Sequence, residues 1–72
     1  MALRKRSISL SGHATSMALE PEFWATLEAM AAAKGLTLAA LLVGIDAERG
    51  ASPLASAARV AALLWAQKQA CA

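Results

Sequence analysis

The sequence predicts a small, mainly helical domain with one short N-terminal strand, which associates with a second chain. Residues 13–19 alternate in polarity as a strand does, and apolar residues then recur at helical spacing over 21–34 and 38–45. At 72 residues the core is so small that oligomerisation commonly supplements it. A lone strand leaves backbone N–H and C=O groups unpaired, so we expect the same strand of a partner chain to pair with it.

Basic residues are concentrated at the start of the chain, although the net charge is only +2. Arg4, Lys5 and Arg6 are the charged residues of the first nineteen positions, and acids slightly outnumber bases in the rest. A basic segment on a near-neutral body favours contact with an anionic partner, the alternative being an ordinary solvated tail.

Cysteine usage and hydropathy predict a cytoplasmic protein without membrane contact. The single cysteine, Cys71, has no partner for an internal disulfide. No apolar signal-peptide core follows the basic residues, and the longest apolar run, 36–45, falls short of the ~20 residues that cross a bilayer.

The strand pattern changes phase at Gly12. Apolar residues fall on even positions before it, at Ile8 and Leu10, and on odd positions after it, at Met17 and Leu19. One straight strand would send the two pairs to opposite faces, so the chain must break over 11–13. We favour a kinked basic arm that leads into a main strand over 13–19, and a tight hairpin is the alternative. The expected core-facing residues of the main strand are Thr15, Met17 and Leu19, and the outward residues are Ala14, Ser16 and Ala18.

Two helices follow, separated by a glycine. Pro21 suits the first position of a helix, Gly35 suits the left-handed residue after its end, and Thr37 can cap the next helix through its hydroxyl. We expect Leu36 to fold back onto the first helix and Gly44 to permit a close helix neighbour. The apolar face of the first helix is Phe23, Leu27, Met30, Ala31 and the stem of Lys34. That of the second helix is Leu38, Leu41, Leu42 and Ile45.

A polar loop is expected over 46–52, after which Ser52 and Pro53 open a third helix. We expect residues 67–72 to fray. Trp24 and Trp65 are interpreted as packing residues, because stacking on bases would require a basic, aromatic-lined groove. The apolar stripe of the third helix is Leu54, Ala57, Ala58, Ala61, Leu64 and Trp65.

The order of these motifs resembles the ribbon-helix-helix family of DNA-binding proteins over about residues 13–49. The ribbon corresponds to 15–19, the opening of the first helix to 20–24, and the turn between helices to 35–37. The core positions that match are Leu27, Met30 and Ala31. The basic lead-in, the break over 11–13 and the extra C-terminal helix resemble a small bacterial subgroup of this family.

The resemblance implies a bacterial transcriptional regulator that is an intertwined homodimer. Two chains would pair their strands into an intermolecular antiparallel ribbon that enters the DNA major groove, and the start of the second helix would bind a phosphate. The chain would divide into a basic arm over 1–12, with or without a short strand, a core over 13–50 and an additional helix and tail over 51–72. The expected DNA-binding residues are Arg4, Lys5, Arg6, His13, Ala14, Ser16, Ala18 and Thr37. The expected dimer core is Met17, Leu19, Phe23, Leu27, Leu41, Leu42 and Ile45.

A second interpretation stays open, because only Ser16 among the outward ribbon residues can hydrogen-bond. The same dimer would then be an antitoxin-like or scaffold module that binds a protein. Catalysis is not expected, since the sequence lacks a nucleophile–base set, a metal-ligand cluster and a phosphate-binding glycine loop. A lone histidine, His13, does not make a metal site, and no cofactor is expected.

Overall fold

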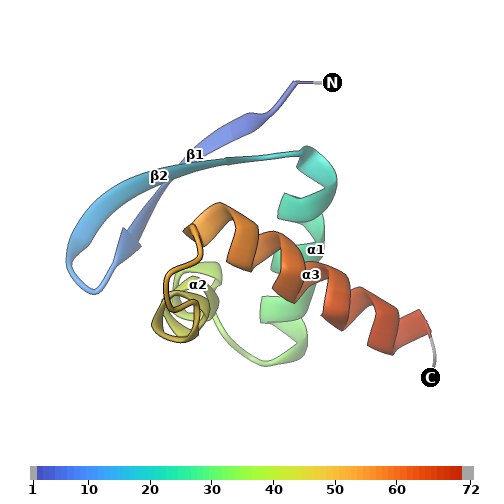
Figure 1. Cartoon of the computed structure of the whole chain (residues 1–72). Helices are drawn as coiled ribbons and strands as arrows, with labels where there is room; N and C mark the ends of the chain where they lie inside the picture. The colour runs from blue at the N-terminus through green and yellow to red at the C-terminus, as the bar shows by residue number, and fades with distance from the viewer. Residues whose placement is uncertain (1, 71–72) are drawn as a thin grey trace.

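The computed structural model describes residues 2–70, which form a β-hairpin followed by three helices. The hairpin covers one side of the helices, and the C-terminal half of the last helix projects beyond the other two (Figure 1). Cys71, which has no partner for an internal disulfide, lies outside the described residues. The elements are β1 (Arg4–Leu10), β2 (His13–Leu19), α1 (Pro21–Ala33), α2 (Leu38–Glu48) and α3 (Leu54–Ala70).

The two strands pair antiparallel within one chain, so the expectation of a single strand preceded by a kinked arm is wrong. Leu10 pairs with His13 across a two-residue turn made by Ser11 and Gly12, whose φ angles are 51° and 85°. Positive φ at both central residues is the requirement of a type I′ turn, the connection that best matches the twist of a hairpin. The break that we expected over 11–13 is therefore this turn.

The phase change at Gly12 is a consequence of the two-residue turn. An even-numbered residue of β1 always pairs with an odd-numbered residue of β2, and paired side chains share a face. Four apolar side chains, Ile8, Leu10, Met17 and Leu19, thus face the helices together and are buried. Thr15 is on this inner face as well, but it is exposed rather than part of the core.

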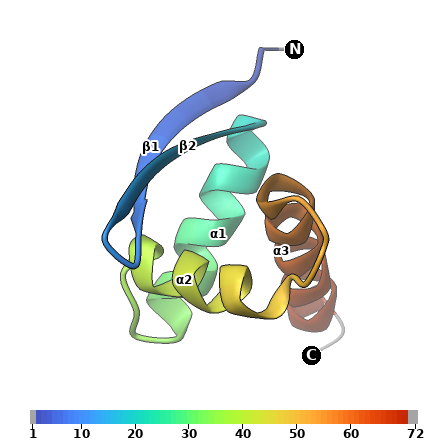
Figure 2. The same ribbon diagram turned by 60° about the vertical axis from the view of Figure 1, so that its left-hand side comes forward.

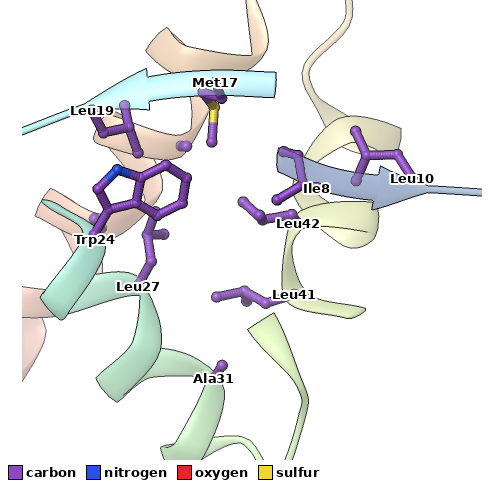
Figure 3. Close-up of a cluster of buried hydrophobic side chains, with 11 residues drawn as sticks. Ile8, Leu10, Met17, Leu19, Trp24, Leu27, Ala31, Leu41 and Leu42 are labelled. Atoms are coloured by element: carbon purple, nitrogen blue, oxygen red, sulfur yellow. The ribbon is translucent and has the colours of Figure 1, made fainter. Parts of the chain in front are cut away.

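The core lies between the inner face of the hairpin and the helices. Trp24 of α1 is only 4% exposed, and its indole lies between Leu19 of β2 and Leu27, while Ile8 of β1 faces Leu42 of α2 (Figure 3). Of the residues that we expected in a core shared by two chains, Met17, Leu19, Leu27, Leu41 and Leu42 are buried within one chain. Phe23 and Ile45 are partly buried against them.

The connection between α1 and α2 confirms the expected capping. Gly35 has φ 68°, and the backbone N–H of Leu36 donates to the carbonyl of Ala31 at 2.8 Å, the bond that closes a helix C-terminus of this kind. The hydroxyl of Thr37 accepts a hydrogen bond from the backbone N–H of Ala40 at 3.0 Å. The two helices meet at 99°, which places α2 across the end of α1 (Figure 2).

The last two helices are longer than expected. An ion pair of 2.6 Å joins Asp46 to Arg49 one turn on, and α2 continues to Glu48 into the segment expected as a loop. Helix α3 continues to Ala70, so residues 67–70 are helical rather than frayed. The space beside Gly44 is open within the described chain, and no neighbouring helix of this chain fills it.

The buried face of α3 also differs from the expected stripe. Ala58 and Ala62 are its fully buried residues, and their small side chains allow α3 to lie close to α1. Leu64 follows Ala62 by two positions, about 200° around the helix. It therefore points outward and is 59% exposed.

The Trp24 side chain links α1 to the hairpin, because its indole Nε1–H donates to the backbone carbonyl of Arg4 at 2.8 Å. Replacing Trp24 with phenylalanine removes this bond and leaves a gap in the core. We expect the Trp24→Phe variant to lose about 1–3 kcal/mol of unfolding free energy in urea titrations followed by circular dichroism. The matched control is Trp65→Phe on α3, since Trp65 is only half-buried. Equal losses in the two variants would contradict the anchoring role of Trp24.

Candidate nucleic-acid interface

The face of the hairpin that points away from the helices is the candidate interface, and we call it the outer face. Its cross-strand pairs are Lys5 with Ala18, Ser7 with Ser16, and Ser9 with Ala14. All six side chains are short except that of Lys5, and all are exposed except the half-buried Ala18. The result is a surface two strands wide that carries mostly small side chains and three hydroxyl groups.

Four members of the outer face, Lys5, Ala14, Ser16 and Ala18, were expected from the sequence to contact DNA, and two, Ser7 and Ser9, were missed. Ala14, Ser16 and Ala18 point outward as expected. Lys5, Ser7 and Ser9 join them only because β1 folds back onto β2. The signal that could have revealed them was the phase change at Gly12, which a two-residue turn explains.

The N-terminal basic residues do not share one environment. Lys5 is on the outer face, whereas Arg4 and Arg6 belong to the inner side of the ladder. The guanidinium of Arg6 lies 4.8 Å from the centre of the Trp24 ring, and its Nη2 is 3.5 Å from Oε2 of Glu28. Both partners of this ion pair are substantially exposed, so the stacking on Trp24 contributes most to holding Arg6.

The N-terminus of α2 is the second feature that suits an anion. Thr37 caps only the N–H of Ala40, so the first N–H groups of the helix, at Leu38 and Ala39, have no partner from the cap. The helix dipole adds positive potential at the same place. Helix α2 packs under β1, and its first turn lies toward the turn end of the hairpin (Figure 2).

His13 lies apart from the outer face. It follows the turn, pairs with Leu10 and is exposed on the inner side of the ladder at the turn end. The structure therefore brings Lys5, Ala14, Ser16 and Ala18 together on the outer face. His13 and Thr37 lie outside this face, near the turn end of the hairpin.

A polar contact fixes the junction between the hairpin and the helices. Nε of Arg59 on α3 donates to Oε1 of Glu20 at 3.0 Å, and the same guanidinium lies 5.8 Å from the ring centre of Phe23. The backbone N–H of Glu20 and the Arg59 side chain both hydrogen-bond the Glu20 carboxylate and lower its pKa below the ordinary value of 4.5, although burial has a smaller opposing effect.

Within residues 2–70, no three His, Cys, Asp or Glu side chains come together as a metal site.

Among the residues that the structure describes, no single helix is long and apolar enough to cross a membrane. Only α1 and α2 taken together reach that length and composition, and they are sharply bent.

Comparison with protein families finds a match to this chain. The model of the ribbon-helix-helix domain matches residues 3–66, a range that includes the hairpin, α1, α2 and most of α3. Neither the curated proteins nor the solved structures compared with the chain contain a match.

The contact between Glu20 and Arg59 predicts a change in acid stability. The lowered pKa of Glu20 means that its ionised form stabilises the fold above pH 4.5, and that this stabilisation is lost as the pH falls through the still lower folded-state pKa. We expect Arg59→Met to raise the pKa of Glu20 toward its ordinary value, as measured by carboxyl NMR titration. In the same variant, the free energy of unfolding should fall less steeply as the pH is lowered below 4.5. The control is Arg49→Met, which removes a different ion pair, and an unchanged Glu20 pKa in Arg59→Met would refute the assignment.

Proposed function

This chain belongs to the ribbon-helix-helix domain family, and from that premise we propose that it is a homodimeric DNA-binding protein that regulates transcription in a bacterium. Members of this family typically form dimers and bind DNA. The observation that carries the proposal is the outer face of the hairpin, which carries three serines, two alanines and one lysine and is exposed except at the half-buried Ala18. A major groove about 12 Å wide admits a two-stranded β-ribbon, and in the proposed dimer that ribbon is the pair of β2 strands described next.

The dimer forms through the free edge of β2. Each strand of a two-stranded sheet has one unpaired edge, and charged residues on an edge discourage pairing with another chain. Strand β1 carries Arg4, Lys5 and Arg6, whereas β2 carries neither lysine nor arginine nor an acid. Two β2 strands related by a two-fold axis at Ser16 would form the expected intermolecular ribbon, with a β1 strand on either side.

This arrangement assigns roles to the residues named above. Ser16 hydrogen-bonds base edges, and the methyl groups of Ala14 and Ala18 contact thymine methyls. The flanking β1 strands bring Lys5 toward the phosphates on either side of the groove, and the N-terminus of α2 at Thr37 binds a further phosphate. Most of the affinity is then electrostatic, with limited discrimination among sequences.

The protein-binding module remains the second candidate. Apart from Lys5, the only side chains of the outer face that can form hydrogen bonds are serines. Because a serine hydroxyl discriminates poorly among bases, this face is poorly suited to reading a DNA sequence. The exposed leucines of α3, Leu63 and Leu64, independently support the binding of a protein.

The phosphate role of Lys5 predicts a change in salt dependence. Replacing Lys5 with alanine removes two phosphate contacts from the dimer, so the slope of log affinity against log salt should become shallower by about 2. Fluorescence anisotropy with a labelled random duplex over a range of salt concentrations measures this slope. Lys68→Ala, at the far end of α3, is the matched control and should leave the slope unchanged. An unchanged slope for Lys5→Ala would remove Lys5 from the interface.

The proposed dimer edge predicts a contrast between two proline variants. The residues that flank the two-residue turn, Leu10 and His13, form a hydrogen-bonded pair, and along the ladder every second pair is hydrogen-bonded. Ser9 and Ser16 belong to the pairs between these, so the backbone N–H of each points to the free edge of its own strand. Proline there removes an N–H that the hairpin does not use. In sedimentation experiments, Ser16→Pro on β2 should dissociate the dimer at concentrations at which Ser9→Pro on β1 stays dimeric. A dimer lost only in Ser9→Pro would instead place the interface on β1.

A further inference from the structure

The outward side of α3 carries exposed apolar residues that the hairpin and the other helices do not cover. Val60 is 55% exposed and Leu64 is 59% exposed, and they lie one turn apart on the same side of the helix. Leu63 is 52% exposed but faces a separate hollow that α3 forms with α1. Neither side belongs to the outer face of the hairpin.

Val60 and Leu64 line a groove between the end of α2 and α3, which we call the α3 groove. Two adjoining hollows share Glu48, Ala61 and Leu64 and so form one trough. The trough begins at Ser52 and Ser56 and ends at Gln67 and Lys68. The α3 wall from residue 56 to residue 68 is about 18 Å long at a rise of 1.5 Å per residue, the length of a helix of three to four turns.

The C-terminal end of the α3 groove is positively charged. Lys34 and Lys68 both line it, and among the described residues neither forms an ion pair. Helix α3 contains no acid, and Glu48 is the single acid lining the groove. Arg49, the remaining charged residue, is paired with Asp46. Two lysines without partners beside an apolar floor favour an occupant that carries acids next to its apolar residues.

We propose that the α3 groove binds an amphipathic helix of a partner protein, with an apolar stripe on Val60 and Leu64 and acidic residues beside Lys34 and Lys68. Helices of this kind dock in hydrophobic grooves through residues spaced three and four apart. Trp65 and Met30 line the same end, and they provide an aromatic and an adaptable contact. A second copy of α3 is a poorer occupant, because its groove side brings Lys68 and no acid of that helix toward these lysines. The proposal does not depend on DNA binding.

The test uses the full chain and a synthetic helical peptide of about four turns, with leucines at helical spacing and glutamates on both flanks. A reference peptide carries lysines in place of the glutamates. The NMR signals of the two indole N–H groups report the site: we expect the Trp65 signal to shift on titration with the acidic peptide and the buried Trp24 signal to stay. The lysine peptide should bind at least tenfold more weakly.

Variants of exposed residues keep the fold and separate the contributions. The double variant Val60→Ser with Leu64→Ser should bind the acidic peptide at least tenfold more weakly, whereas the matched control Leu63→Ser, equally apolar but outside the groove, should bind it normally. Replacing both Lys34 and Lys68 with glutamate should reverse the preference between the two peptides. The Lys5→Ala variant should bind the acidic peptide as the wild type does, even if its DNA binding is lost.

Four outcomes would overturn the proposal. The first is a Trp65 signal that stays unmoved at millimolar acidic peptide, and the second is equal affinity for both peptides. The third is sedimentation in which Val60→Ser with Leu64→Ser abolishes self-association of the chain, which would assign the groove to a second copy. The fourth is a Trp65 shift with anionic lipid vesicles but not with the acidic peptide, which would assign it to a membrane surface.

Discussion

The two-residue turn at Ser11 and Gly12 is the constraint on which the other features of this fold depend. Positive φ at both positions folds β1 back onto β2 without a longer loop, and the resulting register decides which side chains share a face. With this register, Ile8 and Leu10 join Met17 and Leu19 above the helices. A register shifted by one residue in either strand would send half of these apolar side chains to water.

The same register determines the surface available to a partner. Every residue on the outer face is small or, at Lys5, flexible, so the backbone of the hairpin can approach a binding partner closely. Trp24 holds the open end of the hairpin through the carbonyl of Arg4 and the guanidinium of Arg6, and α2 supports its turn end. A surface supported at both ends loses little conformational entropy when it binds, which favours preorganised docking.

The sequence predicted the parts of this fold that depend on local chemistry. Pro21, Gly35 and Thr37 lie where their backbone preferences place them, and the family resemblance is confirmed by the match over residues 3–66. The pairing of β1 with β2 was weighed only as an alternative, because a phase change is consistent with a kink as well as a turn. The outward position of Leu64 was missed because spacing alone does not tell which side of an alanine-rich helix lies against its neighbour, and the burial of Ala58 and Ala62 decided it.

Amide chemical-shift mapping can locate the surface of this protein that contacts DNA, which we propose is the outer face of the hairpin. A uniformly labelled sample would be titrated with a short duplex at low salt, and the backbone signals of the whole chain would be followed. We expect the largest shifts at the outer-face residues 5, 7, 9, 14, 16 and 18 and at the start of α2, with α3 unaffected. Shifts confined to α3, or no shifts at a duplex concentration that saturates binding, would contradict this proposal.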